Sequence, residues 1–457
     1  SSCFAQAVRA LLPCRAAERP HRSSPHIMER IQRIAQHVVA APPAAGLEAG
    51  LSPSPTSSTM SSDVRSADDV VICSALRTPI AKARRGGFKD TACEELLAPL
   101  FKATIDSTKV DPKLIGDIQI GNASQPGAGA ITARMAQFLG GLPFDIPLVT
   151  VNRQCSSGLQ AVANIASSIR AGIIDIGIAG GVESMSLYSM TEGVDFNKLS
   201  PSILENEMAG HCLMPMGLTS ENVAEAYGIS RETQDTMAAE SHRRAVEAQK
   251  TGRFDSEIVP VKTRVKDAKG NFSEVVVKQD EGPRAGTTVQ SLRALKPAFK
   301  AGGSTTAGNA SQVSDGAAMV LLARRSSAEK LGLPVLARMR SFAVVGVDPK
   351  MMGIGPAFAI PEALKKANVS VDDVDIFEIN EAFASQATMS VEHLKIPMEK
   401  VNPKGGAIAL GHPLGCTGSR QIATLLPELK RTKKKLGVVS MCVGTGMGAA
   451  AVFESEQ

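Results

Sequence analysis

The chain has 457 residues, 43% of them hydrophobic and 21% charged, and no stretch approaches the ~20 uninterrupted apolar residues of a transmembrane helix. Its net charge is +5, but residues 1–62 hold six arginines against three acidic residues, so that only +2 remains for the rest of the chain. This composition predicts a globular protein without a membrane span, and the nearly neutral remainder, with no tryptophan and two tyrosines, argues against nucleic acid as a partner.

Residues 1–62 are predicted to be a targeting leader followed by a disordered linker. Residues 41–62 consist mainly of Ala, Pro, Ser, Gly and Thr, which cannot bury enough apolar surface to fold. Before them, Arg30–Val38 has the pattern Arg-Ile, five residues, His-Val, and it resembles the N-terminal nonapeptide that directs proteins to peroxisomes, with valine in an unusual last position. A mitochondrial presequence is the alternative, because the segment is also acid-poor, arginine-bearing and amphipathic. We expect synthesis to start at Met28, two residues before the nonapeptide.

From Asp69 onward, short apolar runs alternate with helical patterns. The predicted strands of this part are 70–73, 115–120, 148–151 and 173–179, and the predicted helices are 93–107 and 155–171. Because the strands are continuously apolar, they predict a sheet covered on both faces, in an α/β arrangement of layers.

Between about residues 187 and 300 this alternation stops. The region is richer in charged and turn-forming residues and has one long amphipathic helix, predicted over 231–250. We interpret it as a loop domain inserted into the first half of the protein.

The last part of the chain repeats the strand and helix pattern. Its predicted strands are 336–345, 374–379, 436–442 and 449–453, and its predicted helices are 362–367, 382–394 and 419–430. Val151-Asn152 leads into a helix after Gly158, and Val401-Asn402 leads through a glycine-rich turn into a helix after Gly418. This correspondence predicts two related α/β halves, residues 63–325 and 332–457, with the functional site between them.

One of the eight cysteines has the surroundings of a nucleophile. The cysteines lie at positions 3, 14, 73, 93, 155, 212, 416 and 442 and form no CxxC pair, so most of them are expected to be reduced, buried thiols. Cys155 differs because it lies where a predicted strand ends and a helix begins, in Val-Asn-Arg-Gln-Cys-Ser-Ser-Gly. Backbone N–H groups and the helix dipole at such a position lower the pKa of a thiol below its usual ~8.5.

Three further candidates also follow strands or lie in glycine-rich loops. His412 lies in Gly-Gly-Ala-Ile-Ala-Leu-Gly-His-Pro, where it is either a structural histidine or a base on a rigid loop. Cys442 ends a predicted strand, and the glycines after it, beginning with Gly444, suit a turn whose N–H groups face a ligand oxygen. Asn380 closes another strand, a usual place for a side chain that fixes a water or an oxyanion.

Together these segments resemble the thiolase family, in the family's order, between about Asp69 and Glu454. The matching segments are Val-Asn-Arg-Gln-Cys-Ser-Ser-Gly around Cys155, Gly-Gly-Val-Glu-Ser-Met-Ser at 180–186, Thr-Ala-Gly-Asn-Ala-Ser at 306–311, Asn-Glu-Ala-Phe-Ala from Asn380, Gly-Gly-Ala-Ile-Ala-Leu-Gly-His-Pro around His412 and Cys-Val-Gly-Thr-Gly-Met-Gly-Ala-Ala from Cys442. The resemblance implies layers in the order α-β-α-β-α with an inserted loop domain. It is strongest to the peroxisomal 3-ketoacyl-CoA thiolases, for which an N-terminal nonapeptide is characteristic, and it therefore favours the peroxisome.

The resemblance also implies a role for each candidate residue. Cys155 would carry the acyl group as a thioester, His412 would activate it, and Cys442 would be the acid and base. Asn380 would assist His412 in one oxyanion hole, and the N–H groups of Cys155 and Gly444 would form the other. Arg284 and Ser311 would contact CoA.

The implied activity is cleavage of 3-ketoacyl-CoA by CoA to acetyl-CoA and a shortened acyl-CoA, the last step of fatty-acid β-oxidation. CoA would be a co-substrate, with no metal and no other cofactor required. A homodimer and a peroxisomal import receptor are the implied partners.

Three alternatives remain at this point. A decarboxylating ketoacyl synthase is disfavoured because Cys442 stands where that class has a second histidine. A biosynthetic acetoacetyl-CoA thiolase is closer, but such enzymes usually have His-Met-Gly where this chain has Pro215-Met216-Gly217. A non-catalytic lipid carrier could use Cys155, His412 and Cys442 to bind structural zinc, although the sequence offers no fourth ligand with the usual spacing.

Overall fold

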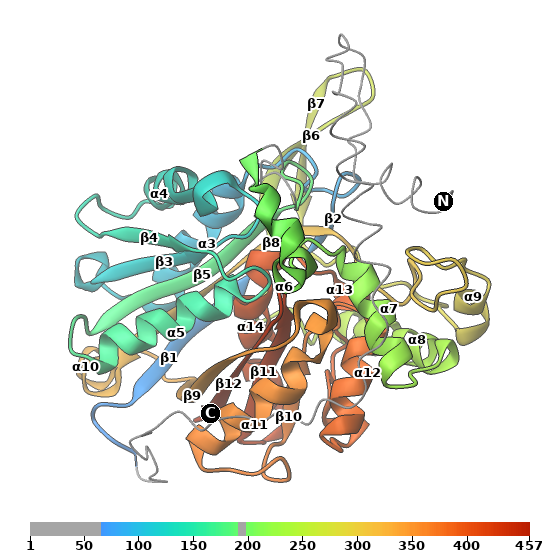
Figure 1. Ribbon diagram of the computed structural model, residues 1–457. Coiled ribbons are helices and arrows are strands. Elements are labelled where there is room, and N and C mark those ends of the chain that lie inside the picture. The colour runs from blue at the N-terminus through green and yellow to red at the C-terminus, as the bar shows by residue number, and fades with distance from the viewer. Residues whose placement is uncertain (1–64, 191–197) are drawn as a thin grey trace.

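The computed structural model describes residues 65–190 and 198–457, which form one mixed sheet with helices on both sides and a separate hairpin (Figure 1). The predicted leader, including Arg30–Val38, lies outside the described residues. The large sheet has the strand order β10-β11-β12-β9-β1-β8-β5-β3-β4, with β2 paired to β8. Its two ends belong to the two halves of the sequence.

The first half contributes the strand order β4-β3-β5-β8-β1. Its strands are β1 (Val70–Arg77), β2 (Ala81–Lys82), β3 (Asp117–Gly121), β4 (Leu148–Val151), β5 (Ile176–Ser184) and β8 (Ser314–Arg324). β3 pairs in parallel with β4 and β5, whereas β8 pairs antiparallel with β5 and β1. The carboxyl ends of β3, β4 and β5 therefore lie at one edge of the sheet.

The second half repeats this arrangement with β9 (Ala337–Gly346), β10 (Ile376–Ile379), β11 (Leu436–Val443) and β12 (Met447–Ser455). β10 and β11 are parallel, and β12 is antiparallel to β11 and β9. Val401 forms a parallel bridge with Phe377 at the position that corresponds to β4. The equivalent strands β1 and β9 pair antiparallel at the centre, as expected for two copies related by a pseudo-twofold axis.

Helices divide this structure into the five predicted layers. α5 (Ser157–Arg170) and α14 (Leu414–Thr432) pack against each other and share a core with strands of both halves. α3 (Cys93–Thr108) and α4 (Ala130–Leu139) cover the outer face of the first half, and α11 (Gly355–Ala367) and α12 (Ala384–His393) lie on the side of the second. The layers thus follow the order α-β-α-β-α, which confirms the predicted fold.

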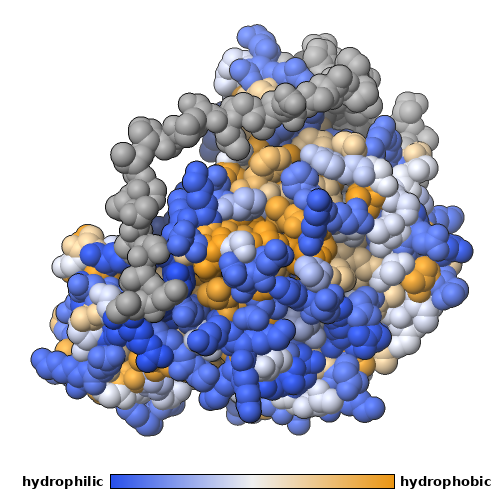
Figure 2. Space-filling view, turned by 90° about the horizontal axis from the view of Figure 1, so that it is seen from below, coloured by the Kyte–Doolittle hydropathy of each residue, from blue (hydrophilic) through white to orange (hydrophobic). Residues whose placement is uncertain are grey.

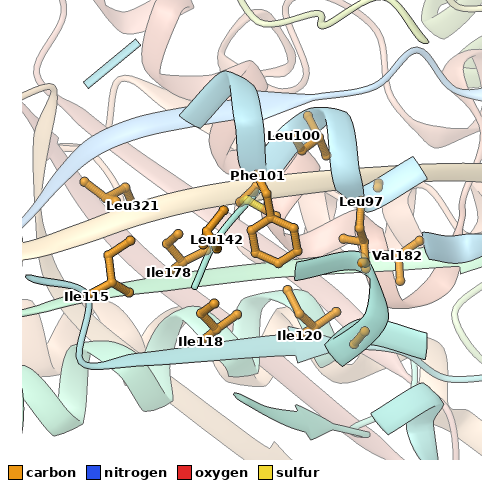
Figure 3. Close-up of a cluster of buried hydrophobic side chains, with 14 of the residues drawn as sticks. Leu97, Leu100, Phe101, Ile115, Ile118, Ile120, Leu142, Ile178, Val182 and Leu321 are labelled. Atoms are coloured by element: carbon orange, nitrogen blue, oxygen red, sulfur yellow. The ribbon is translucent and has the colours of Figure 1, made fainter. Parts of the chain in front are cut away.

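Each outer core is built from one apolar helix face against a sheet. Figure 3 shows Leu97, Leu100 and Phe101 of α3 over Ile118 and Ile120 of β3. On the face seen from below in Figure 2, hydrophilic residues cover most of the surface, and hydrophobic residues gather near its centre. Burial of apolar side chains on both faces of the sheet is the main stabilising contribution to such a layered fold.

The structure differs from the predicted elements mainly in three places. β8 was missing from the prediction because Val320 is its one β-branched residue, and its other apolar residues, Ala, Met and Leu, favour a helix as much as a strand. β5 starts at Ile176 rather than at residue 173, because Ile173 lies exposed in the turn after α5, where Gly172 has φ 73°. α11 begins seven residues before the predicted helix over 362–367, with Pro356 in its first turn.

The predicted loop domain contains the long helix α8 (Arg231–Lys250), at the predicted bounds, and several shorter elements. These are α6 (Glu207–His211), α7 (Met216–Ala226), β6 (Val261–Lys266), β7 (Phe272–Val277) and α9 (Val289–Arg293). The β6–β7 hairpin projects from the body of the molecule (Figure 1). The remaining short helices are α10 (Arg325–Leu331), α13 (Ala407–Leu410) and 3₁₀ turns at Pro112–Leu114, Pro126–Gly129, Pro201–Glu205, Pro349–Ile354 and Met398–Lys400.

A buried ionic network joins this loop domain to both halves. Arg77 on β1 pairs with Glu257 at 2.7 Å and with Asp280 at 2.7 Å, and the Lys404 ammonium pairs with Glu257 at 2.5 Å. The ring of Phe254 lies near both cationic groups. Removing one member would leave a buried charge without its partner, which is strongly destabilising. The network therefore fixes the loop domain next to the 401–411 loop.

Candidate active site

The predicted site residues lie at the ends of strands and the starts of helices, and contacts connect them across the two halves. The N–H of Gly444 hydrogen bonds to the Cys155 sulfur, and the charge of Cys155 acts on Cys442. The Asn380 amide nitrogen lies 3.3 Å from His412 Nε2. The structure thus brings together Cys155, Cys442 and Gly444 on one side, and Asn380 and His412 on the other.

Cys155 is buried just before α5, with 3% of its surface exposed. Gln154 has φ 46° in a tight turn in which the N–H groups of Ser156 and Ser157 donate to the carbonyls of Arg153 and Gln154. Burial raises the pKa of Cys155 to about 11, although the N–H groups of Gly444 and of Cys155 itself act in the opposite direction. The sequence-based expectation of a lowered pKa is therefore wrong for the free protein. The thiol is protonated at neutral pH and needs a base to become a nucleophile.

The environment of His412 keeps its imidazole neutral, which is the state that can accept a proton. Burial, together with the charge of Arg420, lowers the pKa of His412 to about 3. His412 Nδ1 lies 2.6 Å from the Thr417 hydroxyl, and this hydroxyl donates to the carbonyl of Pro413 at 3.1 Å. Since the hydroxyl hydrogen is used there, its oxygen accepts from Nδ1–H, and Nε2 carries the lone pair, which faces the Asn380 amide nitrogen at 3.3 Å.

Thr417 therefore fixes the tautomer of His412, and Thr417→Val tests this. We expect kcat/KM for the reaction that uses Cys155 to fall roughly 10-fold or more, because the valine leaves Nδ1–H without an acceptor and no longer selects the Nε2 lone pair. The measurement is steady-state kinetics alongside a thermal unfolding curve. Thr424→Val on the same helix is the matched control, since Thr424 bonds to Glu257 rather than to His412. An equal loss in both variants would contradict the assignment.

Asn380 and Cys442 close β10 and β11, which are neighbours in the sheet. The N–H of Asn380 donates to Ser440 at 2.9 Å, and its buried Oδ1 has no hydrogen-bond partner among the described residues. Such a buried oxygen is a place for an ordered water. Cys442 is fully buried among Met352 and Phe383, and burial raises the pKa of its thiol, as does the charge of Cys155.

The two residues implied to contact CoA lie on different loops. The N–H of Ser311 donates to Ala382 at 3.0 Å, next to the Asn380 loop. Arg284 is exposed and lines a cavity of about 210 Å³ with Arg243 and Glu247. The backbone N–H of Arg284 donates to His242 Nδ1 at 3.2 Å.

Two buried carboxylates that sequence reasoning left without a role organise the loops of the site. Glu183, at the end of β5, accepts hydrogen bonds from Ala123, Ser124 and Gly415 at 3.0, 3.1 and 2.9 Å. It therefore ties the loop after β3 to the start of α14.

Glu381 has the equivalent task in the second half. It accepts from Ser241 at 2.6 Å, Asn402 at 2.7 Å and Ile408 at 3.2 Å. Both Glu183 and Glu381 are acidic residues at the end of an otherwise apolar strand, next to small residues. This position in the sequence could have indicated a buried carboxylate with hydrogen-bond partners.

Within residues 65–190 and 198–457, no group of three or more His, Cys, Asp or Glu side chains is arranged to hold a metal ion. None of the helices described is both long and apolar enough to cross a membrane.

Comparisons with known proteins cover most of the chain. The thiolase N-terminal domain matches residues 70–326, and the thiolase C-terminal domain matches residues 333–455. The peroxisomal 3-ketoacyl-CoA thiolase B of Rattus norvegicus is 63% identical over 390 residues, which cover 85% of this chain and 91% of the relative. The peroxisomal 3-ketoacyl-CoA thiolase of Homo sapiens is 62% identical over the same lengths.

Solved structures agree with this. The dimeric peroxisomal thiolase of Saccharomyces cerevisiae has 49% sequence identity and a TM-score of 0.80, covering 86% of this chain and 99% of its own. An acetyl-CoA acetyltransferase of Bacillus anthracis has 40% identity and a TM-score of 0.77, covering 85% and 98%.

Proposed function

Because the chain belongs to the thiolase family, we propose that it is a peroxisomal 3-ketoacyl-CoA thiolase, an acetyl-CoA C-acyltransferase. It cleaves 3-ketoacyl-CoA with CoA to acetyl-CoA and a shortened acyl-CoA, the last step of fatty-acid β-oxidation. The observation that carries the proposal is the 63% identity of the chain to such an enzyme over 390 residues, and the proximity of Cys155, from the first half, to Cys442 and Gly444, from the second, supports it.

The first half of the reaction forms an acyl enzyme. Nε2 of His412 takes the proton of the Cys155 thiol, and the thiolate attacks the C3 carbonyl of the substrate. The N–H groups of Cys155 and Gly444 stabilise the resulting oxyanion, a contribution worth about 2.7–4 kcal/mol per donor in comparable sites. The bond between C2 and C3 then breaks, leaving the acyl group on Cys155 and the enolate of acetyl-CoA. The enolate oxygen is held at His412 and Asn380, and Cys442 donates its proton to the enolate carbon.

The second half returns the enzyme to its starting state. The Cys442 thiolate takes the proton of the incoming CoA thiol, and the CoA sulfur attacks the acyl thioester on Cys155. Collapse of the tetrahedral intermediate releases the shortened acyl-CoA, and Cys155 recovers its proton from His412. A group that gives and takes protons in one cycle needs a pKa that its surroundings can bring toward ambient pH. CoA would be met by a few side chains, among which we propose Arg284 and Ser311.

A thiolysis assay with short, medium and long 3-ketoacyl-CoA substrates tests the function. We expect CoA-dependent consumption of substrates longer than acetoacetyl-CoA. Activity with acetoacetyl-CoA alone would favour the biosynthetic class instead. Stoichiometric zinc in the purified protein without thiolysis would favour the non-catalytic lipid carrier.

An exposed apolar face on α4 and β4 supports a homodimer, as in the dimeric yeast relative. Ile131, Leu139 and Phe144 are 71%, 65% and 80% exposed, and Val149 lies on β4, the last strand in the sheet order. Contiguous exposed apolar side chains beside an unpaired strand edge are typical of a protein interface. We propose that two copies meet here, and that the import receptor of the peroxisome binds Arg30–Val38.

A charge in this face should separate the subunits. We expect Val149→Lys to convert the dimer to monomer at micromolar concentration, because a lysine on a strand edge opposes pairing with a second strand. Analytical ultracentrifugation gives the mass of the species in solution. Phe272→Glu, in the exposed part of β7, is the control and should leave the mass unchanged. A Val149→Lys protein with the mass of a dimer would place the interface elsewhere.

A further inference from the structure

The Cys442 thiol has a polar neighbour to which the reaction scheme assigns no part. Gln386 lies in the first turn of α12 and is fully buried. One atom of its side-chain amide lies 3.1 Å from the Cys442 sulfur. The identity of that atom decides whether the amide donates a hydrogen bond to the sulfur or accepts one from it.

The surroundings of the amide select one orientation. With its nitrogen on the side of Asn380, the amide donates to the Asn380 carbonyl at 3.1 Å, and its oxygen accepts from the N–H of Ala387 at 2.6 Å. In the reverse orientation, two acceptors face each other at Asn380 and two donors at Ala387. The nitrogen therefore occupies the position next to Cys442, where its second hydrogen points to the sulfur.

We propose that Gln386 is a positioning residue that donates an N–H to the Cys442 sulfur and stabilises the thiolate formed during each catalytic cycle. The inference rests on the proposed function, because Cys442 needs a stabilised thiolate only if it exchanges protons with the substrate. The apolar residues Met352, Ala382 and Phe383 pack around Cys442. Burial among them raises the pKa of the thiol. A donor at the sulfur opposes this effect.

The structure holds this amide in place from two sides. Gly353 packs directly on Gln386, and a Cβ added to Gly353 would lie 2.7 Å from the Gln386 Cβ. On the other side, the bond to the Asn380 carbonyl joins Gln386 to the residue that contacts His412. The amide thus bridges the ends of β10 and β11, and its orientation cannot change without losing two hydrogen bonds.

Gln386→Met tests the proposal in the full-length protein, because methionine keeps the approximate volume and removes the donor. Thiolate absorbance is measured as a function of pH in the variant and in its Cys442→Ser derivative. Subtracting the second curve from the first gives the titration curve of the Cys442 thiol alone, and its midpoint is compared with that of the same curve for the Gln386 protein. We expect the midpoint to move to higher pH by about one unit or more, equivalent to a tenfold or greater loss of thiolate. Exchange of the acetyl-CoA methyl protons with deuterated water, which requires Cys442 as a base, should slow roughly 10- to 100-fold.

Two variants separate this effect from general damage. Gln421→Met removes a buried amide that bonds to Glu378 instead of Cys442, and it should leave the midpoint unchanged. Gly353→Ala displaces Gln386 without altering it, and it should move the midpoint in the same direction as Gln386→Met. An unchanged midpoint in Gln386→Met, or an equal shift in Gln421→Met, would overturn the proposal. The titration needs no turnover, so a shifted midpoint in a protein without thiolysis would sustain the Gln386 assignment and reject the proposed function.

Discussion

Replacing Cys155 with alanine is expected to abolish CoA-dependent cleavage of 3-ketoacyl-CoA, with kcat/KM falling by at least about 10⁴-fold. The variant lacks the atom that carries the acyl group, and the fully buried Cys442 thiol is committed to proton transfer rather than to attack. The protein should remain folded, because alanine removes a single sulfur beside Ala83 and Leu414. Substrate consumption with and without CoA measures the loss.

Locating the covalent acyl group on the protein tests directly whether Cys155 is the nucleophile. Wild-type protein treated with 3-ketoacyl-CoA and no CoA should carry one acyl group, on the peptide that contains Cys155. Cys212 is exposed and can be modified unspecifically, so the experiment is best done in a Cys212→Ser background. Cys416→Ala, a buried cysteine on α14 near His412, serves as the control and should retain both adduct and activity. An adduct on any other peptide would overturn the role of Cys155.

The duplicated fold could be predicted from the sequence because both halves carry the same local signals. Val151-Asn152 and Val401-Asn402 precede the two helices of the central layer, and the structure places Val401 at the position that corresponds to β4. β8 could not be recognised in this way. It has a single β-branched residue, Val320, and its small residues, such as Gly316 and Ala317, give no strand propensity. Membership of the thiolase family, predicted from the motifs, is confirmed by the matches over residues 70–326 and 333–455.

The sequence singles out a candidate site residue where its local position marks it. Cys155, Asn380 and Cys442 follow predicted strands and His412 lies in a glycine-rich loop, and so these four became candidates. Thr417 and Gln386 act through atoms that only the tertiary structure brings to His412 and Cys442, and a threonine or glutamine in a helix has no sequence signal of its own. The pKa of Cys155 was predicted in the wrong direction for a related reason. The helix start is visible in the sequence, whereas burial, the larger effect, is not.

Replacing Cys442 with serine is expected to separate the two halves of the reaction. A serine hydroxyl can still supply a proton to the strongly basic enolate, so the acyl group should form on Cys155. Once acetyl-CoA has left, the serine alkoxide takes a proton from water, and the neutral hydroxyl is a far weaker base toward the CoA thiol than the Cys442 thiolate, so transfer should slow roughly 10²- to 10⁴-fold. Rapid-quench kinetics should therefore show about one equivalent of acyl enzyme formed in a burst, followed by slow release.

The burst distinguishes this variant from one that is merely damaged. A misfolded protein would lose acylation and transfer together, whereas Cys442→Ser should lose only the second. Cys416→Ser makes the same chemical change at a buried thiol that contacts no reacting group, and it should show neither the accumulation nor the slow phase. If Cys442→Ser transferred the acyl group at the wild-type rate, another base would have to deprotonate CoA, and the remaining candidate at the site is His412. In the proposed scheme His412 is not free for that step, because it holds the Cys155 proton until the acyl group has left, and this is the physical reason for assigning the step to Cys442.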